Sequence, residues 1–169
     1  MNRLQKIALF AAIASAMAAP AFAQNSATVT GTTGTTKIVA PITLAQDAPL
    51  AFGTVVKPTS GNSVITVGAG VGGVASVTSG NAAVVGASGR AHYNVTGETG
   101  MGFTISTTSL TMTRISGTET LPVTLVKSAA TGTIAAGVAD FGVGGSFTVA
   151  SDTVSGDYTG TFNVTVAYN

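Results

Sequence analysis

A two-residue alternation of apolar and polar side chains constrains this chain most, and it is clearest in the final stretch, residues 156–169. One parity carries the apolar or small residues Tyr158, Gly160, Phe162, Val164, Val166 and Tyr168, and the other carries Thr159, Thr161, Asn163 and Thr165. This is the side-chain period of a half-buried strand, so we expect one strand from Gly156 to the end of the sequence. A strand with so rich an apolar row has to be covered by something, and its edge needs a partner.

The sequence after residue 36 repeats this pattern in short runs that are separated by clusters of Gly, Asn, Ser and Pro. The expected strands cover residues 37–45, 50–56, 63–67, 74–78, 91–96, 102–108, 121–127 and 145–150, followed by the terminal strand. Pro41 fits the first of them only at a sheet edge or a bulge. Short strands with regularly spaced turn signals are typical of all-β domains. We therefore predict an antiparallel, immunoglobulin-like β-sandwich over residues 37–169.

The beginning of the chain, residues 1–23, has the pattern of a secretory signal peptide. Arg3 and Lys6 form a short basic start, an apolar run follows, and Ala21-Phe22-Ala23 supplies a small-x-small cleavage site. The apolar run is too short to span a bilayer, which takes about 20 helical residues. We therefore expect a mature chain that starts at Gln24, has no transmembrane segment, passes through the periplasm and reaches the cell surface or the medium.

The charge of the mature chain argues against some partners. Loss of Arg3 and Lys6 leaves five of the seven Lys and Arg side chains against six Asp and Glu, for a net charge of about −1. No basic run is present to hold a phosphate backbone, so nucleic-acid binding has no support. Charged residues make up 8% of the chain, against about 25% in ordinary soluble domains. A surface this poor in charge suits packing against other protein.

The sequence offers little for catalysis, and we expect no enzyme, no cofactor and no metal centre. His92 is the single histidine and cysteine is absent, so the ligands of a zinc site are lacking. A serine triad would need His92 as its base, but the sequence has no nucleophile-elbow motif and no distinctive acid partner for it. His92 falls on the polar parity of its strand, where a solvated side chain is expected. Asp152 and Asp157 flank one loop before the terminal strand, but a calcium site needs more oxygen ligands than these two supply.

Three motifs resemble known families. The end of the chain, with Gly156, an alternating apolar row and the penultimate Tyr168, resembles the carboxyl-terminal signature of pilus subunits of the chaperone-usher route. Pro41-Ile-Thr-Leu44, Leu50-Ala-Phe52-Gly53-Thr-Val55 and the stretch from Tyr158 to Tyr168 are together similar to an uncharacterised secreted bacterial family, a domain of unknown function of the 4402 type.

The pilin resemblance implies a sandwich that is incomplete and is completed by a donor strand from another subunit. It implies an assembly interface at the C-terminal row, formed by Gly156, Tyr158, Gly160, Phe162, Val164, Val166 and Tyr168. Residues 24–36 would be the donor segment, although Ala27 and Val29 are its only apolar side chains. The implied partners are further copies or other pilus subunits, a periplasmic chaperone and an outer-membrane usher.

A second interpretation of the same sequence is a self-contained secreted or cell-surface domain that binds a glycan or a protein. In that case the terminal strand would be satisfied within the domain and no donor would be needed. The sequence leaves open whether the sandwich is complete.

Overall fold

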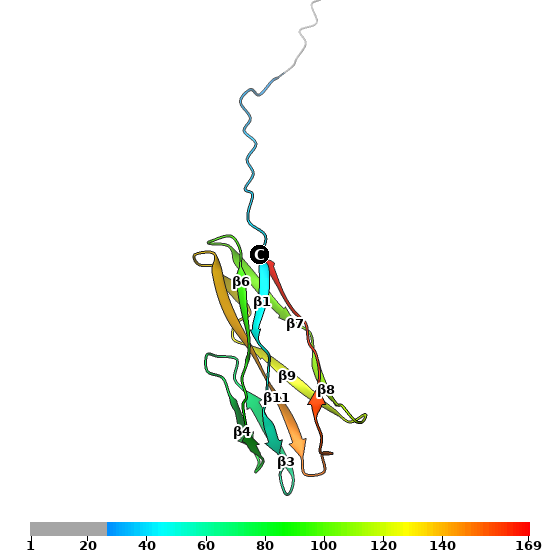
Figure 1. The fold of residues 1–169 in the computed structure, drawn as a ribbon. Coiled ribbons are helices and arrows are strands. Elements are labelled where there is room, and N and C mark those ends of the chain that lie inside the picture. The colour runs from blue at the N-terminus through cyan, green and yellow to red at the C-terminus, as the bar shows by residue number, and fades with distance from the viewer. Residues whose placement is uncertain (1–26) are drawn as a thin grey trace, which may run out of the picture. The chain divides into compact units, whose positions relative to one another are not determined.

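The computed structural model describes residues 27–169, and within that range every regular element is a strand. Residues Lys37–Asn169 form one compact unit, shown in Figure 1. The strands are β1 Thr43–Ala48, β2 Thr54–Val56, β3 Asn62–Val67, β4 Ala75–Ser79, β5 Ala83–Val85, β6 Ala91–Thr96, β7 Gly102–Thr107, β8 Leu110–Arg114, β9 Thr120–Lys127, β10 Thr131–Thr133, β11 Val138–Ala150, β12 Tyr158–Thr159 and β13 Val164–Tyr168. The all-β prediction is confirmed. The expected signal peptide, residues 1–23, lies outside the described residues.

The strands form an antiparallel sandwich. The large sheet has the order β1-β6-β11-β9-β8-β12, with β3 paired to β11 and β4 paired to β3. A three-stranded sheet, β10-β7-β13, and the pair β2-β5 complete the domain. The large sheet curls, and all of its pairings are antiparallel. The sandwich prediction is therefore confirmed.

Strand β11 runs through the centre of the domain and connects its two core clusters. Its first half pairs with β6 and its second half with β3. The chain that leaves β3 passes directly over Gly144, where a Cβ would collide with the carbonyl oxygen of Val67 and come within 2.7 Å of the backbone nitrogen of Ala69. Only glycine fits this crossing.

The core consists of two groups of buried side chains. In the first, the large sheet packs against the three-stranded sheet, and the buried members are Ala91, Tyr93, Val95, Phe103, Ile105, Ile134, Phe141 and Val143. The second group lies between the other half of the large sheet and the segment that includes β2 and β5, and its buried members are Ile65, Leu110, Val123, Phe147 and Val149. The alternation of the sequence thus places one side of each strand in the interior.

The first predicted strand, residues 37–45, is wrong at its beginning. β1 starts only at Thr43, after Pro41, and Ile38 is 90% exposed. The backbone of Ala40 bonds to side chains instead of a neighbouring strand: its N–H donates to the Glu98 carboxylate, and its carbonyl accepts from the Tyr168 hydroxyl. β1 itself lies at the edge of its sheet, and Pro41 precedes it.

Some strands are absent from the prediction. They are β5, β8, β10 and the first half of β11. The alternation of Leu110 and Met112 with threonines would have indicated β8. β11 contains Gly142, Gly144 and Gly145. Glycine carries no side chain that marks a face, so the alternation cannot be followed through the first half of this strand.

The predicted strand 50–56 is also shorter in the structure. Only Thr54–Val56 pairs as a strand, although Ala51 makes an isolated bridge with Gly89. Residues 49–53 therefore lie outside any regular ladder.

Candidate assembly groove

The terminal stretch does not form the single strand predicted from Gly156 onward. β12 pairs with β8, whereas β13 pairs with β7 in the other sheet. Residues 160–163 cross between the sheets, and the backbone N–H of Asn163 donates to the Thr108 hydroxyl while its carbonyl accepts from the Thr108 N–H. The prediction of one uninterrupted strand is wrong because two short strands pair with different neighbours.

The predicted apolar row itself is present. Its side chains are half-buried, and the intervening Thr159, Thr161, Asn163 and Thr165 are exposed. Phe162, Val164, Val166 and Tyr168 pack against the first core cluster of the same chain. The row therefore faces the interior of its own domain.

Gly156 and Gly160 are exposed members of the predicted interface. Gly156 has a φ of 150°, and a Cβ there would lie 2.8 Å from Cδ of Arg114. The chain can turn into β12 at this point because glycine tolerates this backbone conformation.

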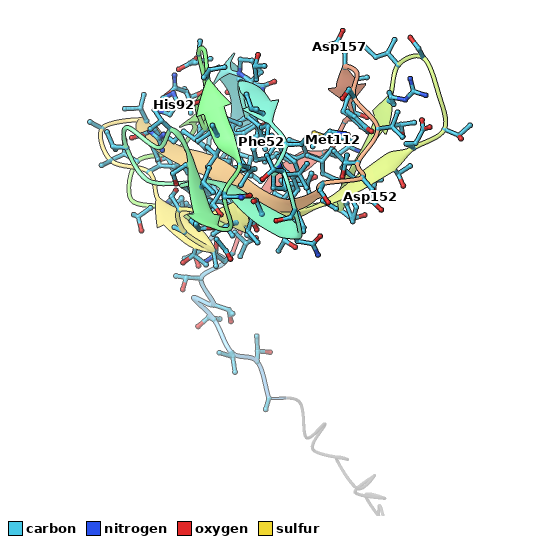
Figure 2. All side chains as sticks on the ribbon, turned by 90° about the horizontal axis from the view of Figure 1, so that it is seen from below. Phe52, His92, Met112, Asp152 and Asp157 are labelled. Atoms are coloured by element: carbon cyan, nitrogen blue, oxygen red, sulfur yellow. The ribbon has the colours of Figure 1, made fainter. Side chains whose placement is uncertain are left out.

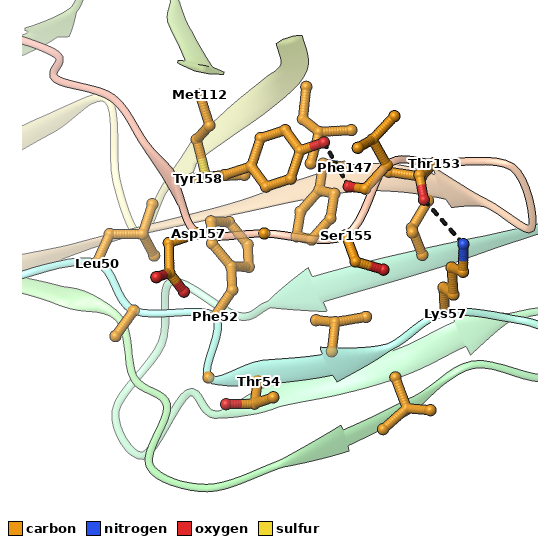
Figure 3. A pocket seen from close by; sticks show the side chains of 18 of the residues that line it. Leu50, Phe52, Thr54, Lys57, Met112, Phe147, Thr153, Ser155, Asp157 and Tyr158 are labelled. Atoms are coloured by element: carbon orange, nitrogen blue, oxygen red, sulfur yellow. Dashed lines mark hydrogen bonds between the residues drawn. The ribbon is translucent and has the colours of Figure 1, made fainter. Parts of the chain in front are cut away.

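A groove opens over the second core cluster, and its wall on one side is this terminal stretch. A cavity of about 780 Å³ and a neighbouring cavity of about 330 Å³ share Leu50, Phe52, Met112 and Tyr158 in their linings. We call the two together the assembly groove. One wall comes from residues 46–57 and the other from residues 153–162; Figure 3 shows the larger cavity.

The floor of the groove is apolar. Met112 of β8, Leu121 of β9, and Phe147 and Val149 of β11 line the larger cavity. The rings of Phe52 and Phe147 meet edge to face, with 4.9 Å between their centroids. Phe52 and Met112, both labelled in Figure 2, are half-buried. The groove thus leaves part of the second core cluster open.

The two walls of the groove are not joined by a ladder within residues 27–169. Near one end, Nζ of Lys57 donates to the carbonyl oxygen of Thr153 at 3.1 Å, and the Tyr158 hydroxyl donates to the Val154 carbonyl within one wall; both bonds are drawn in Figure 3. Residues 54–56 pair with β5 and residues 158–159 with β8. Within the described residues, each of these two short strands is therefore paired along one edge only.

The far end of the terminal strand is tied to the start of the domain. The Tyr168 hydroxyl donates to the Ala40 carbonyl and accepts from the Glu98 N–H, both at 2.8 Å. Figure 1 shows the C-terminus beside the beginning of β1. Tyr168, predicted as the end of an interface, thus has a structural role inside the domain.

The groove carries few charges. Lys57 and Asp157 are the charged residues in the lining of the two cavities. Tyr93, which lines the smaller cavity, has a pKa raised by its burial. At the end of β8 the Arg114 guanidinium donates to Glu119 at 2.7 Å, and this hydrogen bond holds the pKa of the Glu119 carboxyl below its ordinary value. An apolar, uncharged occupant suits such a lining.

The predicted donor residues lie in an extended segment. Residues 27–36 have no regular secondary structure, all of them are exposed, and the Val29 side chain is 83% exposed. The remaining predicted donor residues, 24–26, lie outside the described residues.

His92 lies on the outer face of the large sheet, but it is not simply solvated as predicted. Its Nδ1 lies 3.0 Å from Asp47 and its Nε2 lies 3.2 Å from Asp140, and Asn94 also donates to Asp47. The side chain of His92 is 27% exposed. It bridges three neighbouring strands, because a bulge between Gln46 and Ala48 brings Asp47 beside it.

Asp152 and Asp157 lie in the exposed loop before β12, well away from His92 in Figure 2. Among residues 27–169, no group of histidine, cysteine or carboxylate side chains is placed to hold a metal ion. The same range contains no helix capable of crossing a membrane.

The groove residues of β8 and of the 49–53 segment were missed as site residues. Leu50 and Phe52 were recognised as part of a motif, but their position beside Met112 depends on pairing between distant parts of the chain. No local pattern marks this juxtaposition.

Comparison with known families shows which protein family the chain belongs to. The model of a family described as a domain of unknown function, DUF4402, matches residues 42–168. The match covers most of the sequence, so the protein belongs to the DUF4402 family. A comparison with curated proteins gave no match.

Proposed function

We propose that this protein is a secreted structural subunit of the fimbrial type, which assembles when a strand from another subunit enters the assembly groove. The observation that carries the proposal is the unpaired space between residues 46–57 and 153–162, which lies over an open apolar core. A strand in this space would bond to the free backbone edges and cover the floor.

The energetics favour an extended, apolar occupant. Strand addition supplies main-chain hydrogen bonds, and alternate side chains provide specificity. Each well-buried aliphatic or aromatic side chain contributes about 1.5 to 3 kcal/mol before the ordering of the strand is subtracted. Phe147 and Val149 on the floor offer apolar surface for such side chains.

The donor that we propose is residues 24–36 of a second copy. Fully extended, such a segment reaches about 40 Å, which is longer than the wall formed by residues 153–162. It carries no charged side chain that would have to be buried. Ala27 and Val29 would point toward the floor, since they are the apolar pair on one parity.

The small size of Ala27 and Val29 leaves room for a second kind of donor. A strand from another pilus subunit with bulkier apolar residues would fill more of the groove. A periplasmic chaperone would cover the same groove during export, and an outer-membrane usher would then exchange it for the donor.

Donation from one copy to the next is a head-to-tail contact. Such a contact uses different surfaces on the two partners and extends into a filament unless it closes into a ring. Such a filament would give the chain a structural purpose outside the cell.

Deletion of residues 27–35 is expected to abolish assembly while leaving the domain folded. The deleted segment makes no strand within the domain, so thermal unfolding should be unchanged. The measurement is the ladder of boiling-resistant multimers on a denaturing gel of shed surface material. Multimers that persist in the deletion variant would rule out this donor. A monodisperse exported monomer of the unaltered chain would instead favour the self-contained binding domain.

A charge in the groove is expected to have the same effect. Val55→Glu places a carboxylate in the lining of the larger cavity, where a donor strand would bury it, so multimers should fall about tenfold or more. Val126→Glu is the matched control, because Val126 is 52% exposed and lines neither cavity. Equal assembly of the two variants would contradict the location of the groove.

A further inference from the structure

Met112 is the oxidisable side chain of the assembly groove. The chain contains no cysteine and no tryptophan, so thioethers are its most readily oxidised groups. Met101 and Met112 are the two methionines of the compact unit. Met112 lines both cavities, whereas Met101 lines neither.

The position of Met112 makes its sulfur reachable while the groove is empty. It lies in the middle of β8, opposite Leu121 of β9. Its side chain is only half-buried, in contrast to Leu110 two positions earlier, which is 5% exposed. It packs against the second core cluster, and Figure 3 shows it beside Tyr158 among the side chains that line the larger cavity.

We propose that Met112 is a site of reversible oxidation that controls whether the groove accepts a donor strand. This inference rests on the proposed function. The oxidant is a peroxide. The sulfur lone pair attacks one peroxide oxygen, an S–O bond forms and the O–O bond breaks, so the thioether loses two electrons and hydrogen peroxide is reduced to water.

The sulfoxide changes what the floor can bind. It replaces a flexible apolar group with a polar one that carries a strong hydrogen-bond acceptor. A donor strand that covers this position would bury the sulfoxide oxygen against apolar neighbours such as Leu121 and Phe52, whose side chains offer it no hydrogen-bond donor. Occupation of the groove should protect Met112 in return, because the strand would cover it.

Met101 provides a control within the same molecule. Its sulfur accepts from Nζ of Lys37 at 3.8 Å, near the first core cluster and outside the groove. Oxidation at Met101 leaves the groove lining unchanged. If oxidation acts through the groove, the loss of multimer formation must therefore follow the oxidation state of Met112 and not that of Met101.

The test treats the purified, unassembled mature chain with increasing hydrogen peroxide. Peptide mapping by mass spectrometry measures sulfoxide at each methionine, and a denaturing gel without boiling measures multimers formed afterwards. We expect multimer formation to fall about tenfold in step with oxidation of Met112, which corresponds to ~1.4 kcal/mol. Methionine sulfoxide reductases should restore it.

Variants make the assignment specific. Met112→Leu should assemble normally and resist peroxide, whereas Met101→Leu should remain sensitive. Met112→Gln, which imitates the polarity of the sulfoxide, should assemble poorly without oxidant, and Met101→Gln should assemble normally. Circular dichroism of each variant checks that the fold is intact.

The outcomes separate this inference from the proposed function. Multimers that form equally well after Met112 has been oxidised, or a Met112→Leu variant that stays sensitive, would overturn the role of Met112 alone. Absence of multimers from the untreated chain would overturn the strand-exchange function together with it.

Discussion

Replacing Tyr168 with serine is expected to lower the free energy of unfolding by about 3 kcal/mol or more, in the range of large-to-small changes of packed aromatic residues. The ring packs against the first core cluster. Its hydroxyl joins the Ala40 carbonyl to the Glu98 N–H, and both backbone groups lose a partner in the variant. Chemical denaturation of the purified domain measures the effect.

Tyr168→Phe separates the ring from the hydroxyl. This variant keeps the packing and loses only the two hydrogen bonds, so it should be destabilised by about 1 to 2 kcal/mol. A serine variant as stable as the phenylalanine variant would show that the ring contributes nothing to the fold.

The serine variant, Tyr168→Ser, also tests the proposed recognition by a periplasmic chaperone. Tyr168→Ser should accumulate poorly in the periplasm for two reasons. The domain is less stable, and a chaperone that contacts Tyr168 would bind the terminal strand less tightly. Val143→Ala, a cavity variant at a fully buried position away from that end, supplies a control of lowered stability. Accumulation of Tyr168→Ser at the level expected from its stability would argue that no chaperone depends on this residue.

Gly144→Ala is expected to be strongly destabilising although it adds only one methyl group. The added methyl group would collide with the backbone carbonyl of Val67 and approach the backbone of Gly68 and Ala69 at 2.7 Å. Backbone cannot move aside as a side chain can, so β3 and β11 would have to separate where they pair. We expect a loss of about 3 kcal/mol or more, or failure to fold, measured by thermal unfolding.

Gly70→Ala is the matched control for this prediction. A Cβ at Gly70 meets nothing within 4 Å, and its φ is not in the left-handed region. This variant should melt within a few degrees of the unaltered chain. Equal melting of the two alanine variants would contradict the close crossing at Gly144.

The alternation of side chains predicted the strands where one face is buried and the other is wet. Residues 91–96 were predicted with the bounds that β6 has, because Ala91, Tyr93 and Val95 mark the inner face. The prediction failed over the first half of β11, where Gly142 and Gly144 take the places of marker side chains. The prediction also failed before β1. The alternation of Ile38 and Ala40 indicated a strand there, but the backbone of Ala40 bonds to side chains and not to a neighbouring strand.

The terminal row shows what a local pattern leaves open. Its parity was predicted correctly, and each apolar member from Phe162 onward is half-buried. Its division into β12 and β13 was not predictable, because the alternation continues unbroken through residues 160–163. The change of partner from β8 to β7 depends on strands about fifty residues earlier in the chain.

The groove was the least predictable part. Its existence depends on two walls that do not pair with each other and on a floor contributed by β8, β9 and β11. The sequence indicated a terminal strand in need of cover and a motif at Leu50 and Phe52. It could not indicate that these two features face each other.

The contact between Tyr168 and Ala40 has a mechanical consequence. A pull on residues 27–36 reaches the backbone of Ala40 before it reaches β1, and the Tyr168 hydroxyl and the Glu98 carboxylate both bond to that backbone. The load then spreads into β13 and the turn after β6, instead of falling on the first hydrogen bonds of β1. In the proposed filament, tension would therefore load these bonds before it could peel the edge strand β1 from its sheet.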